Sequence, residues 1–269
     1  MSTPSMMRKM VVEALGPFAL VFLGAGSIIS TQFTGGDGGV TNLVAIGLAH
    51  GLAIAVMIAA LGHISGGHFN PAVTIGLLIG KKTDLQTAVS YIIAQLVGAT
   101  LGAGALTLVF RDVDRNAVNL GLPALGANVT VGNALAVEAI MTAFLMLVIW
   151  GVAVDKRGAG MIAPLAIGLT IAIDIMMGGP VSGAAMNPAR HFGPMIIQQD
   201  FTNFWIYWIG PVAGAIFAAL LYTRVIAPDL NEVEEAASEA DDLAVARSTV
   251  ASQSGAQADR SRRSQRRKR

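Results

Sequence analysis

Two short stretches of the chain carry the same unusual set of residues, SGGHFNPAVT at 65–74 and SGAAMNPARH at 182–191. Proline is well accepted at the first position of a helix, and asparagine is a favoured residue just before that position. Each stretch is therefore predicted to begin a short helix, with a partial positive charge at its N-terminus and an asparagine amide beside it. The residues concerned are Asn70, Pro71, Ala72, Asn187, Pro188 and Ala189.

Two such N-termini facing each other can hold a small neutral molecule between two amide donors. They repel cations, including hydronium, because both helix ends are positive. A water molecule held by two donors does not easily pass a proton along a file of waters. This is the chemistry of a selective pore. The alternative is that each asparagine only caps its own helix.

Arg190 follows the second Asn-Pro-Ala directly and places a charge in an otherwise apolar stretch. A charge within a membrane is costly and usually serves a function. The guanidinium would repel cations and offer hydrogen-bond donors to a passing solute. The alternative is an arginine that binds loop carbonyl groups and has no part in a pore.

The apolar segments around these stretches must position them. Of the 269 residues, 54% are hydrophobic and 13% are charged, whereas soluble domains carry about 25% charged residues. A membrane-spanning helix needs about 20 mostly apolar residues. Six segments meet that length, near 10–31, 42–62, 86–110, 131–154, 159–178 and 203–227, and two shorter pieces near 70–80 and 187–197 do not. The short pieces are predicted to be re-entrant half-helices, so the fold is predicted to be an all-α membrane protein with six transmembrane helices.

The two halves of the chain resemble each other. VVEALGPFALVFLGAGS from residue 11 is similar to AVEAIMTAFLMLVIWG from residue 136, and each copy carries a glutamate, Glu13 or Glu138. Each half consists of three spans with a half-helix before the third, so the second copy enters from the opposite side and the repeat is inverted. Inverted repeats place their site near the bilayer midplane, at the broken helices.

Basic residues gather in the loops on one side of the predicted spans. Arg8 and Lys9 precede the first span, Lys81 and Lys82 follow the second, and Lys156 and Arg157 follow the fourth. Because cytoplasmic loops are rich in Lys and Arg, both termini are predicted to be cytoplasmic. The predicted organisation is a cytoplasmic N-terminus at 1–9, a channel domain at 10–227 and a cytoplasmic tail at 228–269. The two repeats are expected at about 10–110 and 131–227.

The tail has an acidic run at 229–242 and a basic end, RSRRSQRRKR, at 260–269. It has few large apolar residues and is predicted to be disordered. Its basic end would contact anionic lipid or simply pair with the acidic run, and no nucleic-acid partner is expected. The chain has no cysteine, which excludes disulfides, thiol catalysis and thiolate metal sites. We expect no metal, no cofactor and no enzymatic activity.

In these motifs the sequence closely resembles the aquaporin, or major intrinsic protein, family. The resemblance covers about residues 8–227 and rests on Glu13, SGGHFNPAVT, Glu138, MNPARHFGP at 186–194 and WIYWIGP at 205–211. It implies a right-handed bundle of six helices, one pore in each protomer and a homotetramer. It also implies that Glu13 and Glu138 brace the re-entrant loops through backbone N–H groups. His68 matches a histidine common in the family, and its interpretation is left between loop bracing and pH gating.

The family has a second constriction beside the asparagine pair, formed by four positions. Counting from the two motifs without gaps assigns them here to His50, Ile175, Ala184 and Arg190. Water-selective members carry Phe, His, a small residue and Arg, and glycerol facilitators carry Trp, Gly, Phe and Arg. The set found here is closer to plant tonoplast-type members and to some archaeal and bacterial relatives. For His50, a bond to a neighbouring helix is the alternative to a place in the lumen.

The predicted function is a passive transmembrane channel that conducts water and excludes protons and ions, with ammonia, hydrogen peroxide and carbon dioxide as candidate further solutes. The aromatic pair Tyr207-Trp208 favours the aquaporin type over glycerol facilitators, although His191 after the arginine fits neither type. The alternatives are a facilitator of glycerol or other small neutral solutes and, further away, a secondary transporter. The expected location is the plasma membrane, the cell's inner membrane.

Overall fold

The computed structural model describes residues 4–34 and 40–230 of the chain. The described residues up to Val225 form one compact unit, which holds the helical bundle described below. Of the predicted tail, only residues 228–230 fall within the described part of the chain, so the predictions about its acidic run and its basic end lie outside the described residues.

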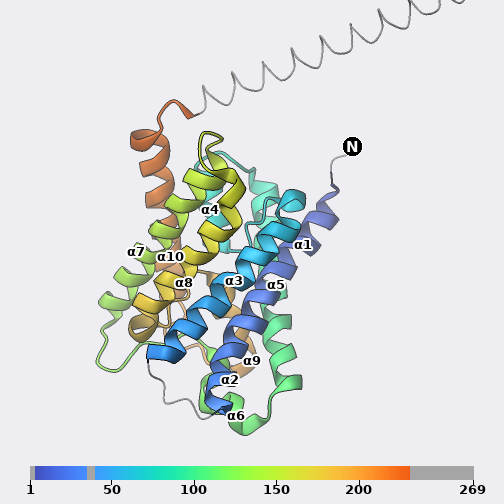
Figure 1. The fold of residues 1–269 in the computed structure, drawn as a ribbon, viewed down its shortest axis with the longest axis vertical. Coiled ribbons are helices and arrows are strands. Elements are labelled where there is room, and N and C mark those ends of the chain that lie inside the picture. Colours follow the sequence, from blue (N-terminus) through green and yellow to red (C-terminus); the bar gives the residue numbers. More distant parts are fainter. Residues whose placement is uncertain (1–3, 35–39, 231–269) are drawn as a thin grey trace, which may run out of the picture. The chain divides into compact units, whose positions relative to one another are not determined.

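Within the described ranges, six helices are long and apolar enough to cross a membrane (Figure 1). The first is built from α1 (Met6–Ala19), η1 (Leu20–Ala25) and α2 (Gly26–Phe33), followed by α3 (Val40–Ser65) and α5 (Leu85–Val109). The fourth joins α7 (Val131–Ile149) to η3 (Trp150–Val154), and the fifth joins η4 (Gly160–Ile162) to α8 (Ala163–Ser182). The sixth joins α10 (Ile206–Leu221) to η5 (Tyr222–Ile226). The predicted all-α fold with six spans is confirmed.

Two short helices, α4 (Pro71–Ile79) and α9 (Pro188–Gln198), are the predicted half-helices. In Figure 1, α4 lies in the half of the bundle where the chain begins, and α9 lies in the opposite half. We call these the N-terminal side and the far side. The loop on the far side contains α6 (Asp112–Ala117) and η2 (Asn119–Gly121).

Helix boundaries differ from the sequence prediction where local capping decides them. The first span begins at Met6, earlier than the predicted start near 10, because the Ser5 hydroxyl accepts the N–H of Arg8. The fifth span continues past 178 to Ser182 and ends at Gly183, whose φ of 81° stops the helix. The sixth span begins at Ile206 and not at 203, since Asn203 has a left-handed φ of 53°.

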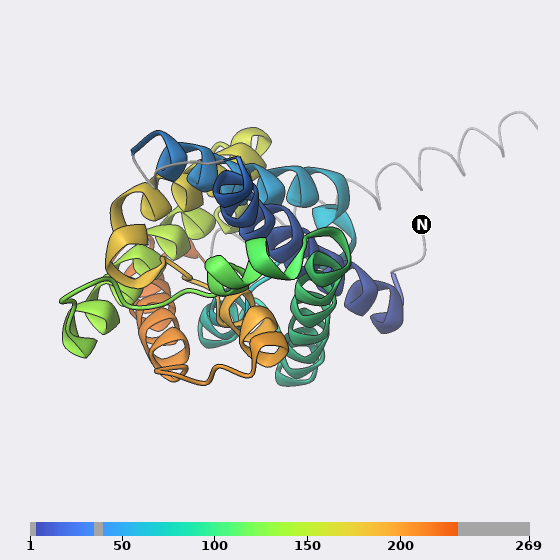
Figure 2. The ribbon, with the colours of Figure 1, turned by 90° about the horizontal axis from the view of Figure 1, so that it is seen from below.

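The packing follows the repeat. The pair α1–α5 in the first half corresponds to α7–α10 in the second, and α5–α9 corresponds to α10–α4. The pair α3–α8 joins the two halves at their centre. Seen from the far side, α9 lies between α5 and α10 (Figure 2). Each half-helix is therefore packed against the last span of the other repeat.

Small residues allow these close approaches. A Cβ on Gly98 would collide with the backbone of Ala14, and a Cβ on Gly214 would collide with the backbone of Ala139. These glycines occupy equivalent places on the α1–α5 and α7–α10 contacts. Larger residues there would push the spans apart and disturb the half-helices held between them.

Candidate functional site

Asn70 and Asn187 cap the two half-helices, as the sequence predicts for asparagine before proline. The Asn70 Oδ1 accepts the N–H of Ala72 at 2.8 Å. The Asn187 Oδ1 accepts the N–H groups of Ala189 at 3.0 Å and of Arg190 at 3.3 Å. These bonds fix the plane of each amide at the positive end of its helix.

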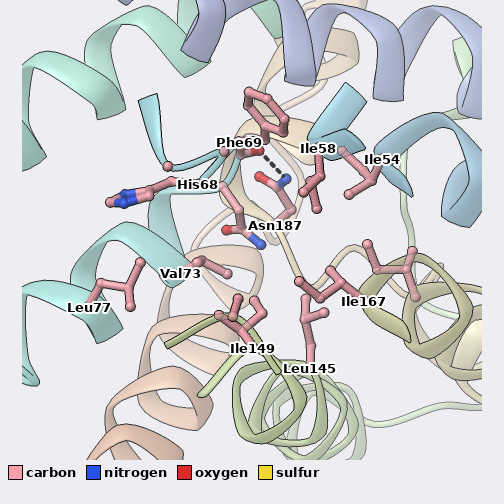
Figure 3. A pocket seen from close by; sticks show the side chains of 15 residues that line it. Ile54, Ile58, His68, Phe69, Val73, Leu77, Leu145, Ile149, Ile167 and Asn187 are labelled. Carbon is pink, nitrogen blue, oxygen red and sulfur yellow. Dashed lines mark hydrogen bonds between the residues drawn. The ribbon is translucent and has the colours of Figure 1, made fainter. Parts of the chain in front are cut away.

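The same amides also bind across the repeat. The Asn70 Nδ2 donates to the carbonyl oxygen of Met186 at 2.9 Å, and the Asn187 Nδ2 donates to the carbonyl oxygen of Phe69 at 2.9 Å. Figure 3 shows the second of these bonds. Each accepting carbonyl belongs to the residue just before the opposite asparagine. An amide nitrogen carries two hydrogens, so each asparagine keeps a second donor for a molecule between the loops.

Glu13 holds the first loop from the buried face of α1. Its Oε1 accepts the Ser65 hydroxyl at 2.6 Å and the N–H of His68 at 3.0 Å, and its Oε2 accepts the N–H of Phe69 at 2.8 Å. The amide of Gln95 on α5 donates to the same Oε2 at 2.8 Å. All four partners are donors, so the carboxylate acts as an acceptor alone.

Glu138 holds the second loop in the same way. Its Oε1 accepts the Ser182 hydroxyl at 2.6 Å and the N–H of Ala185 at 2.9 Å, and its Oε2 accepts the N–H of Met186 at 2.7 Å. Both glutamates are fully buried. Both lie in spanning helices, where only paired carboxylates are stable.

Arg190 is buried and is held by two elements outside its own half-helix. Its Nε donates to the Nε2 of His50 on α3 at 3.1 Å, and its Nη2 donates to the carbonyl oxygen of Gly121 at 2.8 Å. The His50 Nδ1 lies 2.8 Å from the carbonyl oxygen of Ile46. Since arginine only donates and a carbonyl only accepts, His50 carries its proton on Nδ1 and is a neutral ring. Arg190 Nη1 has no partner among the described residues.

One narrow cavity brings the predicted constriction together. His50, Ile175, Ala184 and Arg190 line it, along with both asparagines, and it has about 270 Å³ of free space. Ungapped counting from the motifs therefore leads to four residues that share one cavity. His50 reaches this cavity while its ring is also bonded within α3 and to Arg190.

A wider cavity of about 520 Å³ lies on the N-terminal side of the asparagines. Its wall is mainly aliphatic, and His68 and the backbone of 66–69 supply its polar side (Figure 3). The His68 Nδ1 is 3.2 Å from the Thr74 hydroxyl, and its ring packs edge-on against Tyr91. The two cavities share Asn70 and Asn187, so the asparagine pair separates a wide apolar half from a narrow charged half.

Comparison with known proteins gives the family of this arrangement. Residues 1–222 match the family described as Major intrinsic protein. The chain belongs to this family. It is 41% identical over 242 residues to a protein of Arabidopsis thaliana named Probable aquaporin TIP3-2, and the match covers 85% of this chain and 87% of the relative. It is 39% identical over 234 residues to a Nicotiana alata protein named Probable aquaporin NIP-type, covering 86% and 83% of the two chains.

Among solved structures, the chain is similar to the aquaglyceroporin from Plasmodium falciparum, with a TM-score of 0.74 and 28% identity. The match covers 84% of this chain and 99% of that one. As a major intrinsic protein, the chain is an integral membrane channel for water or small neutral solutes and is not an enzyme. The relatives divide between two named aquaporin types at about 40% identity, so the subtype belongs to the proposal below.

Sequence analysis did not predict that two tyrosines close the loops of this major intrinsic protein, although it named Tyr207 for another reason. Tyr91 on α5 donates to the carbonyl oxygen of Ser65 at 2.7 Å, and Tyr207 on α10 donates to that of Ser182 at 2.8 Å. Aligning the third span of each repeat would have found them, because they lie 21 and 20 residues after the two asparagines.

His191 differs from the residue at the equivalent position of the first repeat. It occupies the place of Thr74 in the first repeat, is fully buried and stacks on Tyr207 at 4.0 Å between ring centroids. Neither ring nitrogen has a hydrogen-bond partner among the described residues. The His191 ring fills the space beside Tyr207. In the first repeat, the ring of His68 fills the equivalent space beside Tyr91.

Proposed function

We propose that this major intrinsic protein is a passive channel whose main solute is water. The observation that carries the proposal is the convergence of Asn70, Asn187 and Arg190 on one cavity whose remaining wall is mostly apolar. Three sets of fixed donors replace part of the hydration of a passing water molecule. The remaining wall is mostly apolar, so water passes without being held tightly.

The same groups support the exclusion of ions and protons. Arg190 and the N-termini of α4 and α9 place positive charge along the narrow half of the path. The second hydrogen of each asparagine amide orients a water molecule as an acceptor on both sides, which opposes proton transfer along the file. Cations and hydronium therefore meet a barrier that a neutral solute does not.

The narrow cavity also supports a broader set of neutral solutes than water alone. Ile175 supplies an apolar wall where water-selective relatives have histidine, and Ala184 leaves space beside Arg190. We propose the aquaporin type with a tonoplast-like constriction, and ammonia, hydrogen peroxide and carbon dioxide as further solutes. Because His50 is neutral, Arg190 is the charged side chain of this constriction.

The remaining proposals concern placement in the membrane. We propose residues 10–227 as the channel domain, a homotetramer with one pore in each protomer, and a plasma-membrane location with both termini cytoplasmic. The basic residues Lys81, Lys82, Lys156 and Arg157 lie in loops on the N-terminal side, which favours this orientation. Contact of the basic tail with anionic lipid is also part of the proposal.

Stopped-flow measurement of water, glycerol and ammonia flux in liposomes tests the main solute. We expect fast water flux and slower glycerol flux. Fast glycerol flux with little water flux would instead favour the glycerol facilitator, and saturation or dependence on a proton gradient would favour a secondary transporter.

Replacing Ile175 with histidine tests the constriction itself. The added polar ring should narrow the cavity and lower ammonia flux relative to water by about tenfold, which corresponds to about 1.4 kcal/mol. Leu165→His, on the exposed face of the same helix, is the matched control and should leave the ratio unchanged. Unchanged ammonia flux in Ile175→His would show that Ile175 is not a constriction residue.

A further inference from the structure

The loop of residues 118–122 on the far side contacts α9 at both of its ends. At the start of α9, the carbonyl oxygen of Gly121 accepts from Arg190 Nη2 at 2.8 Å. At the other end of α9, the Asn119 side chain bonds the side chains of Gln198 and Asp200. The loop is therefore attached at both ends to the half-helix that carries the arginine.

The second attachment has a defined direction. The Asn119 Nδ2 donates to the Oδ2 of Asp200 at 2.9 Å, and its Oδ1 accepts from the Gln198 Nε2 at 3.0 Å. The other carboxylate oxygen of Asp200 accepts the N–H of Thr202. Hydrogen bonds from Thr202 and Asn119 hold the pKa of Asp200 below its usual range, so the carboxylate is charged at neutral pH.

Between these attachments the backbone is unusual. Asn119, Leu120 and Gly121 have φ values of 48°, 55° and 68°, all in the left-handed region. Asparagine and glycine adopt this region readily, whereas leucine does so only when its surroundings hold it there. Leu120 is fully buried, and it belongs to a cluster with Val21 and Ala189. Three consecutive left-handed residues turn the Gly121 carbonyl toward Arg190.

We propose that Asn119 is a positioning residue that sets the selectivity of the channel by fixing the Gly121 carbonyl on Arg190. The inference rests on the proposed function, because it needs Arg190 to select among neutral solutes. Arg190 has two partners outside its own half-helix, His50 and Gly121. Loss of the second would free the Nη2 end of the guanidinium to rotate about its bond to His50. The narrow cavity would then change width at the place where solutes are distinguished.

A charge-exchange cycle tests this role, with the glycerol-to-water flux ratio in liposomes as the readout. Asn119→Asp places one carboxylate against the other at the Asp200 contact and pushes the loop away. We expect the ratio to rise about fivefold, the size of a typical coupling between connected groups. The double variant Asn119→Asp with Asp200→Asn restores both bonds and exchanges donor and acceptor only in the bond between positions 119 and 200. The new amide at position 200 can donate, and the new carboxylate at position 119 can accept from it and from Gln198. The double variant should return the ratio to the wild-type value.

Asn119→Gly is a further variant, because it accepts the left-handed backbone but has no side chain for Asp200 or Gln198. Like Asn119→Asp, it should raise the glycerol-to-water flux ratio. A purely structural role would lower water and glycerol flux together and leave the ratio unchanged. A wild-type ratio in both single variants, or a double variant that behaves like Asn119→Asp, would overturn the proposal. Wild-type protein that passes glycerol but little water would refute the proposed main solute, and the cycle would still report whether Asn119 controls the ratio.

Discussion

The two loops that meet at the asparagine pair are held by equivalent sets of hydrogen bonds, but they present different side chains to a solute. Both have a buried glutamate, a serine hydroxyl, a tyrosine on the third span and an asparagine bonded across the repeat. The loops differ in the two residues that follow Asn-Pro-Ala. Where the first loop has Val73, the second has Arg190, and where the first has Thr74, the second has His191.

This comparison separates positioning from selectivity. The shared bonds fix backbone that is otherwise strained, since Phe69 and Met186 have left-handed φ values of 50° and 51°. The unshared residues decide polarity and width, so the first loop opens to the wide aliphatic cavity and the second to the narrow charged one. The two repeats have kept the same support and differ in the surface that faces a solute.

The largest expected effect comes from breaking the shared support. Glu138→Gln and Glu13→Gln each place an amide donor against backbone N–H groups that now donate to a carboxylate. Each unsatisfied buried N–H costs about 1–3 kcal/mol, so both variants should lose stability in a thermal unfolding assay in detergent. Glu13→Gln should lose less, because the Gln95 Oε1, which has no partner among the described residues, can turn toward the new amide. Equal loss in the two variants would contradict this difference between the loops.

The next effect comes from making the second loop like the first. Arg190→Val copies Val73, removes the guanidinium and opens the narrow cavity. We expect the glycerol-to-water flux ratio to rise about tenfold, the order of one lost charge-assisted hydrogen bond. Cation leak should appear as well. Val73→Ala, in the wide half, is the matched control and should not change ion exclusion; if it did, the charged half would not be the selective one.

His191 affects stability and not selectivity, and the sign of its effect depends on the substitution. His191→Phe keeps a ring on Tyr207 and removes two buried nitrogens that have no partners among the described residues, so stability should be unchanged or about 1 kcal/mol higher. His191→Thr copies Thr74, loses the ring stack and leaves a cavity, and should cost about 2–3 kcal/mol. The midpoints of thermal unfolding distinguish the two. A His191→Phe variant as unstable as His191→Thr would mean that the ring nitrogens make bonds through water.

The smallest effect concerns the loop after η3, where the second repeat carries an ion pair. Arg157 binds Asp155 at 2.8 Å and holds the pKa of Asp155 at about 2, below its ordinary value of 3.8. A lowered pKa stabilises the fold above about pH 4, and this contribution is lost as the pH falls through about 2. Arg157 is 44% exposed, so solvent screening limits the contribution to below about 1 kcal/mol. Asp155→Asn should therefore be slightly less stable than wild type at neutral pH and equal to it near pH 2, as measured by thermal unfolding at the two pH values.

Sequence reasoning reached the architecture because membrane crossing imposes a length and a polarity that composition displays directly. It assigned the four residues of the predicted constriction by counting from the two motifs, and these four residues line one cavity. It did not predict the roles of Asn119, Tyr91 or Tyr207. Those roles depend on long-range contacts, such as Asn119 with Asp200, and only the tyrosines have a sequence signal, which is their equivalent position in the two repeats. The sequence also did not indicate that the ring nitrogens of His191 would have no hydrogen-bond partner among the described residues, since pairing depends on what surrounds a side chain in space.

The crossed bonds between the asparagines and the opposite loops also bear on how the chain is made. Asn70 donates to Met186 and Asn187 donates to Phe69, across 116 and 118 residues. Ribosomes add about 5–20 residues per second, so roughly ten seconds pass between synthesis of the first loop and of its partner. During that interval the Phe69 carbonyl and the Asn70 amide have no counterpart on the nascent chain. The first loop can therefore bind Glu13 and Tyr91 early, whereas the crossed asparagine bonds form only after the second loop has been made.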